Sequence, residues 1–257
     1  MCELFGLDSV NKINVSGLLK EFFSHGNEHP NGWGLAFFYG NGVSLEKQPE
    51  NSVKSMYLKH RLEGCVVADK MIAHIRLATK GCMEYENSHP FVMRDNYGRA
   101  WTFAHNGTIF ESDVLNKYVR RQRGSTDSER ILMYITDNIN EAQETAQRAL
   151  DKEERFDIID RIMCTLAPEN KLNLLIYDGE LLYAHTNMKG TLHVLRLEGT
   201  VIISTRPLDQ RNWEELPLNT LTAFEEGRQV FTGTDHGYEF FETEEKMKLL
   251  FLDYACL

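Results

Sequence analysis

Tight turns between short apolar segments limit what this chain can fold into more than any other feature of its sequence. Residues 34–39 are strand-like, and the Gly-Asn-Gly turn at 40–42 reverses the chain. Asp-Gly at 178–179 joins residues 172–177 to 181–184 in the same way. Strands joined by such turns pair as antiparallel neighbours. Further strand-like segments are 66–76, 100–105, 192–197, 201–204, 221–224 and 229–232.

Helical patterns fall in blocks between these strands. Ser16 can cap a short amphipathic helix. Thr126 and Glu129 form a capping-box pattern that opens a long helix running towards Leu150, and a second helix is expected over 155–166. Because hairpins and helices are segregated, we predict an antiparallel α+β fold. We see no repeat and no linker, which favours a single domain over residues 1–257.

Composition excludes several classes of protein. Apolar residues make up 42% of the 257 residues and charged residues 26%, as in ordinary globular proteins. A net charge of -10 argues against a nucleic-acid partner. No apolar run is long enough for a membrane span, and the first residues do not resemble a signal peptide. The five cysteines include no C-x-x-C pair, so we expect reduced thiols in the cytoplasm.

Cys2 is the first candidate for chemistry. Removal of Met1 exposes an N-terminal cysteine, which has a thiol and an α-amine in one residue. Their ordinary pKa values are about 8.5 and about 8, so a proton passes between them easily at neutral pH. An N-terminal amine can therefore act as base for the adjacent nucleophile. Taken alone, a cysteine at position 2 is more often accidental.

Four further segments carry polar side chains that are candidates for chemistry. Arg76 follows an apolar strand and is suited to grip a carboxylate, although a surface arginine is the simpler interpretation. Asn106-Gly107 offers a side-chain amide and an open backbone N–H for an oxyanion, or forms an ordinary hairpin turn. Asp127 can receive an ammonium group or complement the helix dipole. His89 can line a pocket or be a satisfied loop histidine.

Metal and phosphate chemistry is not indicated. His25 and His29 flank a glutamate at zinc-helix spacing, but Gly26 and Pro30 disfavour a regular helix there. The chain has no glycine-rich phosphate loop. We therefore expect no cofactor and no metal.

The order of the motifs is more specific than any one of them. Together they resemble the class II glutamine amidotransferases, and most closely the small stand-alone members of the predicted glutamine amidotransferase group. The motifs are Met-Cys-Glu-Leu-Phe-Gly at 1–6, Pro-Asn-Gly-Trp-Gly at 30–34, His-Ile-Arg-Leu-Ala-Thr at 74–79, Asn-Ser-His-Pro-Phe at 87–91, Ala-His-Asn-Gly-Thr-Ile at 104–109 and Ser-Thr-Asp-Ser-Glu at 125–129. Segments 201–208 and 213–217 resemble the group's C-terminal half, so the likeness spans nearly the whole chain.

This resemblance implies a four-layer αββα sandwich of two antiparallel sheets, the N-terminal-nucleophile hydrolase fold. It also implies that Cys2 attacks the side-chain amide of glutamine, or of a related γ-glutamyl amide, to form a γ-glutamyl thioester. Asn106 and Gly107 would hold the oxyanion. Water would then release glutamate.

The resemblance assigns substrate-binding roles as well. Arg76 would pair with the substrate α-carboxylate and Asp127 with its α-ammonium, while Thr79 and His89 match positions near the pocket. Two residues depart from the pattern, because many relatives carry Trp at the position of Leu77 and His at that of Lys80. Both departures concern the shape of the pocket.

The purpose of the chemistry stays open at this level. Synthase-fused relatives continue into a second domain, whereas this sequence ends at Leu257, so we expect no acceptor site. The protein could instead be a glutaminase subunit that supplies ammonia to a separate synthase. It could trim γ-glutamyl groups from thiol-containing metabolites, or be a catalytically silent amino-acid-binding module on the same scaffold.

Overall fold

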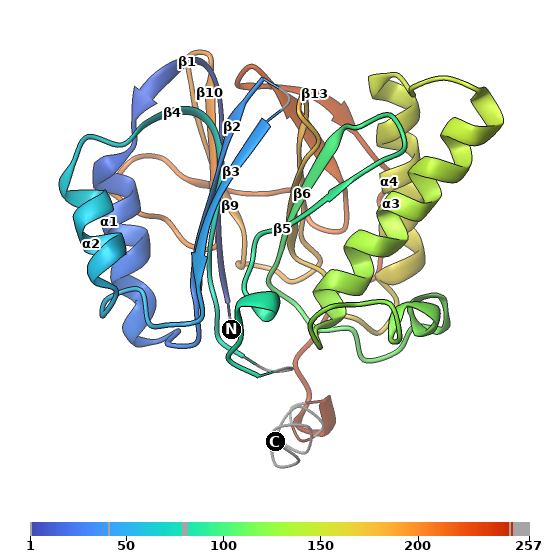
Figure 1. The fold of residues 1–257 in the computed structure, drawn as a ribbon, viewed down its shortest axis with the longest axis horizontal. Coiled ribbons are helices and arrows are strands. Elements are labelled where there is room, and N and C mark those ends of the chain that lie inside the picture. Colours follow the sequence, from blue (N-terminus) through green and yellow to red (C-terminus); the bar gives the residue numbers. More distant parts are fainter. Residues whose placement is uncertain (1, 41, 79–81, 247, 249–257) are drawn as a thin grey trace.

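The computed structural model describes residues 2–40, 42–78, 82–246 and 248. Two antiparallel sheets pack face to face, and helices cover the outer face of each sheet (Figure 1). The arrangement is a four-layer αββα sandwich of two antiparallel sheets, so the predicted α+β class is confirmed.

The first sheet has seven strands in the described residues, in the order β11-β9-β10-β1-β4-β2-β3. Their bounds are β1 Glu3–Asn14, β2 Trp33–Tyr39, β3 Gly42–Gln48, β4 Val67–Ile75, β9 His193–Leu197, β10 Thr200–Ser204 and β11 Glu214–Glu215. Strand β1 lies at the centre and pairs with β10 and β4. The residue that precedes β1 is therefore surrounded by other elements.

The second sheet has six strands in the same part of the chain, in the order β13-β12-β8-β7-β6-β5. They are β5 Phe91–Arg94, β6 Ala100–His105, β7 Leu174–Tyr177, β8 Leu182–His185, β12 Thr222–Glu225 and β13 Arg228–Thr232. Strand β6 pairs with β7, although the 68 residues 106–173 lie between the two strands in the sequence. This pairing brings residues 171–173 beside the end of β6.

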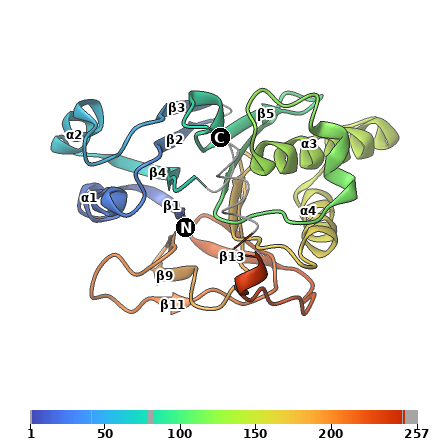
Figure 2. The same ribbon diagram turned by 90° about the horizontal axis from the view of Figure 1, so that it is seen from below.

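Helices α1 Ser16–Ser24 and α2 Met56–Glu63 cover the first sheet, and α3 Asp127–Ala146 and α4 Lys152–Leu166 cover the second (Figure 2). Short 3₁₀ helices are η1 His25–Asn27, η2 Tyr85–Asn87 and η3 Asp113–Tyr118. None of the helices in the described residues is both long and apolar enough to cross a bilayer.

Alternation along the strands separates the apolar core into layers. In β1, Phe5 and Leu7 pack towards α1 and α2, whereas Leu4 faces the other sheet. Successive side chains of a strand point to opposite faces, so each sheet with two buried faces contributes to two layers. Gly6 lies where the sheets approach closely, because a Cβ there would come 3.0 Å from Leu175 Cδ1.

Several local predictions need correction. Ser16 does not cap α1; it lies in the first turn, and its hydroxyl accepts the Val66 N–H at 2.8 Å. Thr126 does cap α3, but the Glu129 carboxylate accepts the N–H groups of Arg123 and Gly124 rather than completing a box. The helix predicted from 155 begins three residues earlier, where a full capping box joins Asp151 to Glu154.

Candidate active site

Cys2 lies at the point where β1 begins, beside the end of β4. The Leu77 N–H donates to the Cys2 sulfur at 3.3 Å, and the thiol donates to the Leu77 carbonyl at 3.3 Å. This position follows from the register of the sheet, in which Glu3 pairs with Ile75. Cys2 as a whole residue is neither fully buried nor fully exposed.

Arg76 follows directly after β4 and is 2% exposed. Its backbone is held on both sides, because its N–H donates to the Gly32 carbonyl at 2.8 Å and its carbonyl accepts the Asn31 N–H at 3.0 Å. Its guanidinium donates to the Cys82 carbonyl at 2.9 Å. The interpretation as a surface arginine is therefore wrong, and the guanidinium is fixed near Cys2.

Asn106 and Gly107 do not form a hairpin turn. The Asn106 N–H donates to the Asn173 carbonyl at 2.8 Å, and Thr108 exchanges backbone hydrogen bonds with Lys171 at 3.0 and 3.1 Å. Gly107 is required here, since a Cβ would lie 2.1 Å from the Lys171 carbonyl oxygen. The Asn106 side-chain nitrogen is buried and has no hydrogen-bond partner in the described part of the chain. An unpaired buried donor is what an oxyanion site requires before substrate binds.

Asp127 is the first residue of α3 and is 5% exposed. One carboxylate oxygen accepts the Ile109 N–H at 2.7 Å, and the other accepts the N–H of Ser128 at 2.9 Å. The carboxylate thus joins the start of α3 to the loop after β6. A carboxylate accepts about four hydrogen bonds, so further capacity is left for a substrate ammonium group.

Three buried histidines lie behind this loop. The His74 Nε2–H donates to the His105 carbonyl at 3.2 Å, and the His89 ring stacks on His74 with centroids 4.2 Å apart. Burial lowers the pKa of His74 to about 3 and lowers the pKa of His89 and His105, so all three rings are neutral at pH 7. Both ring nitrogens of His89 are buried without a partner among the described residues. Thr79 lies outside the described residues.

Two charged groups near Cys2 were not found from the sequence. Burial raises the pKa of the Cys2 thiol above its ordinary value, and the Leu77 backbone and the positive charges of Arg76 and Lys171 offset only part of this rise. Lys171 reaches this position only through the pairing of β6 with β7, for which the sequence has no local signal.

Glu3 is the second of these groups and is 1% exposed. His25 Nδ1 lies 2.8 Å and His29 Nε2 3.1 Å from its carboxylate, which also accepts a hydrogen bond from Arg206. Burial raises the pKa of Glu3, but these partners outweigh it and lower the pKa overall. The two histidines with zinc-helix spacing are therefore neighbours of a structural carboxylate.

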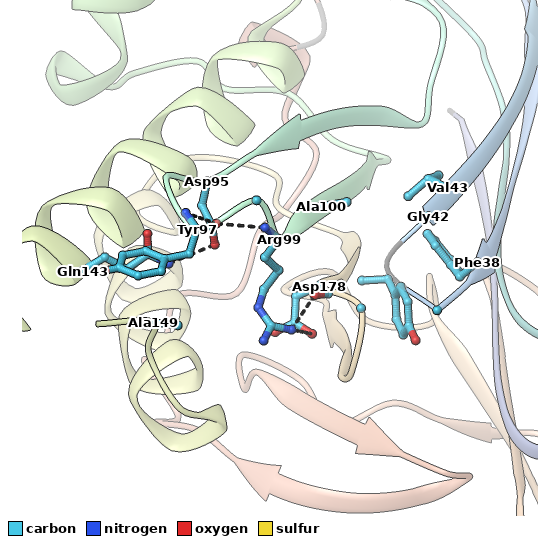
Figure 3. A pocket seen from close by; sticks show the side chains of 14 residues that line it. Phe38, Gly42, Val43, Asp95, Tyr97, Arg99, Ala100, Gln143, Ala149 and Asp178 are labelled. Atoms are coloured by element: carbon cyan, nitrogen blue, oxygen red, sulfur yellow. Dashed lines mark hydrogen bonds and ion pairs between the residues drawn. The ribbon is translucent and has the colours of Figure 1, made fainter. Parts of the chain in front are cut away.

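A small cavity of about 140 Å³ lies at the other end of the sandwich, beside the turns that follow β2, β5 and β7 (Figure 3). Its carboxylates already accept hydrogen bonds from other residues of the protein. Asp95 accepts the N–H groups of Tyr97 and Arg99, and Asp178 accepts from the Arg155 guanidinium at 2.7 Å. This cavity supports turns and is remote from Cys2. No cluster of three or more metal-binding side chains occurs in the described ranges.

The fold is shared with solved structures. A predicted glutamine amidotransferase from Pseudomonas aeruginosa matches with a TM-score of 0.62 and 23% identity, over 90% of this chain and 100% of that one. The glutamine phosphoribosylpyrophosphate amidotransferase of B. subtilis matches with a TM-score of 0.63 and 16% identity, over 89% of this chain and 48% of that one. At these identities the likeness concerns the fold alone.

Sequence comparison defines the family. Residues 1–199 match the family described as Glutamine amidotransferases class-II. An uncharacterized protein of Methanocaldococcus jannaschii is 30% identical over 260 residues, covering 90% of this chain and 71% of the relative. The chain belongs to the class II glutamine amidotransferase family.

Proposed function

We propose that this protein is a cysteine-dependent amidohydrolase that cleaves the side-chain amide of glutamine or of a related γ-glutamyl amide. The main support is the buried, unpartnered side-chain nitrogen of Asn106, which the β6–β7 pairing holds at the end of the sandwich where Cys2 lies. Arg76 and Asp127 lie at the same end and supply opposite charges, which suits an amino acid backbone.

In the proposed reaction the Cys2 sulfur attacks the amide carbon, and the α-amine exposed by removal of Met1 accepts the thiol proton. The carbonyl oxygen becomes negative and is held by the Asn106 amide and the Gly107 N–H. The C–N bond then breaks, the amine leaves with the proton, and a γ-glutamyl thioester remains. Water hydrolyses the thioester to glutamate and restores the thiol.

Two charged residues would orient the substrate during these steps. Arg76 would grip the α-carboxylate, and Asp127 would accept hydrogen bonds from the α-ammonium. Their backbones are fixed by Gly32 and by the start of α3, so little ordering is needed on binding.

The test is glutamate release from glutamine and from a set of γ-glutamyl amides, with the native N-terminus determined by mass spectrometry. We expect a mature chain that begins with Cys2, and complete loss of release in Cys2→Ala. Undiminished release by Cys2→Ala, or active protein that retains Met1, would contradict the proposal. Met1 retention without activity would instead favour an amino-acid-binding module.

A second purpose for the same chemistry is ammonia supply to a separate synthase. The observation that favours it is the B. subtilis structure, of which this chain matches 48%. Activity that is low in isolation and rises when a synthase partner is added would support this role. Activity that no partner changes would count against it.

A further inference from the structure

Asn87 is a buried asparagine whose side-chain amide joins two segments that lie far apart in the chain. It ends the short helix η2 and is 0% exposed. Its amide nitrogen donates to the Cys82 carbonyl at 3.0 Å and to the Ser125 hydroxyl at 3.1 Å, and its amide oxygen accepts the Ser125 N–H at 2.8 Å. Both amide hydrogens are therefore used, together with one lone pair of the oxygen. A buried amide with these partners fixes the two segments relative to each other.

The first of these segments holds the Arg76 side chain. The Cys82 carbonyl that accepts from Asn87 also accepts from the Arg76 guanidinium at 2.9 Å. The same segment is closed on itself, because the Asn87 N–H donates to the Glu84 carbonyl at 3.2 Å. The direction of the Arg76 guanidinium therefore depends on where Asn87 places the Cys82 carbonyl.

The second segment is the loop 123–125, which leads into Asp127 at the start of α3. Glu129 of the same helix accepts the N–H groups of the first two loop residues at 2.9 and 2.8 Å, so the loop is fixed to the helix. Gly124 permits the close approach of the other segment, because a Cβ at this position would lie 2.3 Å from the Asn87 amide oxygen. Asn87 thus connects the surroundings of the guanidinium to the loop that precedes the carboxylate.

We infer that Asn87 is a positioning residue that sets the separation between Arg76 and Asp127, and thereby makes the site selective for ligands with both an α-carboxylate and an α-ammonium group. The inference rests on the proposed roles of Arg76 and Asp127 in substrate binding. In glutamine the two charged groups are attached to one carbon, so their spacing is fixed, and a site binds both only if its own charges have the matching spacing. A ligand with only one of these charges can shift towards the residue that binds it.

The test is binding of three ligands to the Cys2→Ala protein, measured by NMR titration, which reports weak as well as tight binding. The ligands are glutamine, glutaramate, which lacks the α-ammonium, and 4-aminobutanamide, which lacks the α-carboxylate. Adding Asn87→Ala to this protein should weaken glutamine binding about 10- to 100-fold, because the two charges are no longer held at one spacing. Binding of each one-charge analogue should weaken much less.

Two further variants control this measurement. Ser125→Ala changes an exposed residue, removes only the hydroxyl partner of Asn87 and keeps the backbone bond, so it should cause a smaller loss of the same kind. The matched control is Gln143→Ala, which removes another buried amide that joins α3 to a loop, through a bond to the Asp95 carboxylate at 3.0 Å. That bond lies beside the cavity remote from Cys2, so Gln143→Ala should leave all three affinities unchanged.

The pattern of losses decides the inference. If Asn87→Ala weakens all three ligands equally, or weakens glutamine and a single analogue equally, Asn87 does not set the spacing and the inference is overturned. Unchanged glutamine binding in Asn87→Ala, or no glutamine binding in the parent protein, would overturn it as well. If Asn87→Ala does not fold, the same comparison is made with Ser125→Ala. Failure of the proposed function is seen separately, as glutamate release by Cys2→Ala, and the three affinities can still be compared in that case.

Discussion

At the end of the sandwich that carries Cys2, buried polar atoms lie without partners in the described part of the chain, whereas the opposite end pairs a comparable set of charges. The unpaired atoms are the side-chain nitrogen of Asn106, both ring nitrogens of His89 and Nδ1 of His74. At the other end, Asp178 accepts hydrogen bonds from Arg155, from Tyr183 and from two backbone N–H groups. Unpaired buried groups lower stability, so the three side chains near Cys2 that have unpaired atoms in the described ranges point to a functional requirement there.

The largest expected effect comes from the paired end. Arg155→Met leaves the Asp178 carboxylate buried without its guanidinium, and should lower the free energy of unfolding by about 3–5 kcal/mol. The matched control is Arg99→Met, which removes a 25% exposed guanidinium near the same carboxylate and should have a much smaller effect. Urea denaturation measures both. If folded Arg155→Met protein turned over at a lower rate, the separation of the two ends would be wrong.

Asn106→Ala should have the opposite effect, with a lower turnover rate and an unchanged free energy of unfolding. Loss of an oxyanion donor lowers kcat about 100- to 1,000-fold, while stability should hold because the side-chain nitrogen has no described partner to lose. The control is Asn187→Ala, whose amide bonds Leu172, Asn170 and Tyr238 and whose loss should lower stability by about 1–3 kcal/mol. A destabilised Asn106→Ala protein with normal kcat would assign Asn106 to structure.

The neutral histidines predict that the free energy of unfolding depends on pH. Because burial lowers the pKa of His89 in the folded state, the unfolded chain binds more protons below pH 6.5. The free energy of unfolding should therefore decrease as the pH falls below about 6.5. The expected decrease is about 1.4 kcal/mol per pH unit for each such ring. His89→Phe should reduce this slope in urea titrations at pH 5, 6 and 7. An unchanged slope would mean that His89 binds a proton as readily in the folded protein as in the unfolded chain, which would contradict its lowered pKa.

The helix caps give the smallest effect and compare the two ends directly. Thr126 caps α3 at the Cys2 end, and Asp151 caps α4 at the other. Replacement of either by Ala should cost about 1 kcal/mol in thermal unfolding. Only Thr126→Ala should also raise KM for glutamine, because the first residue of α3 is Asp127. Equal KM values in the two variants would indicate that Asp127 does not take part in substrate binding.

Local chemistry in the sequence was sufficient for much of the fold. Strand β6 has the predicted bounds, because apolar residues on both faces give a clear signal. Helix α2 was missed, since only Leu58 and Leu62 of its residues are buried. Strand β1 was also missed as a strand, although its first residues carried the family motif.

The candidate site likewise contains residues that the sequence indicated and residues that it did not. Motif order pointed to Cys2, Arg76, Asn106 and Asp127, and the structure brings their elements to one end of the sandwich. Their proposed roles stay predictions that the variants above test. Lys171 could not be found in this manner, because it belongs to no motif.

The sequence by itself determined the turns, most strands and the types of side chain available for chemistry, since these depend on interactions between near neighbours. Only the tertiary structure decided that Asn106 and Thr108 bond to residues 171–173, so that Asn106-Gly107 does not form a turn. It also decided that Lys171 is buried beside the end of β6. Strand pairing between segments far apart in the chain sets both, and such pairing depends on the packing of the whole core.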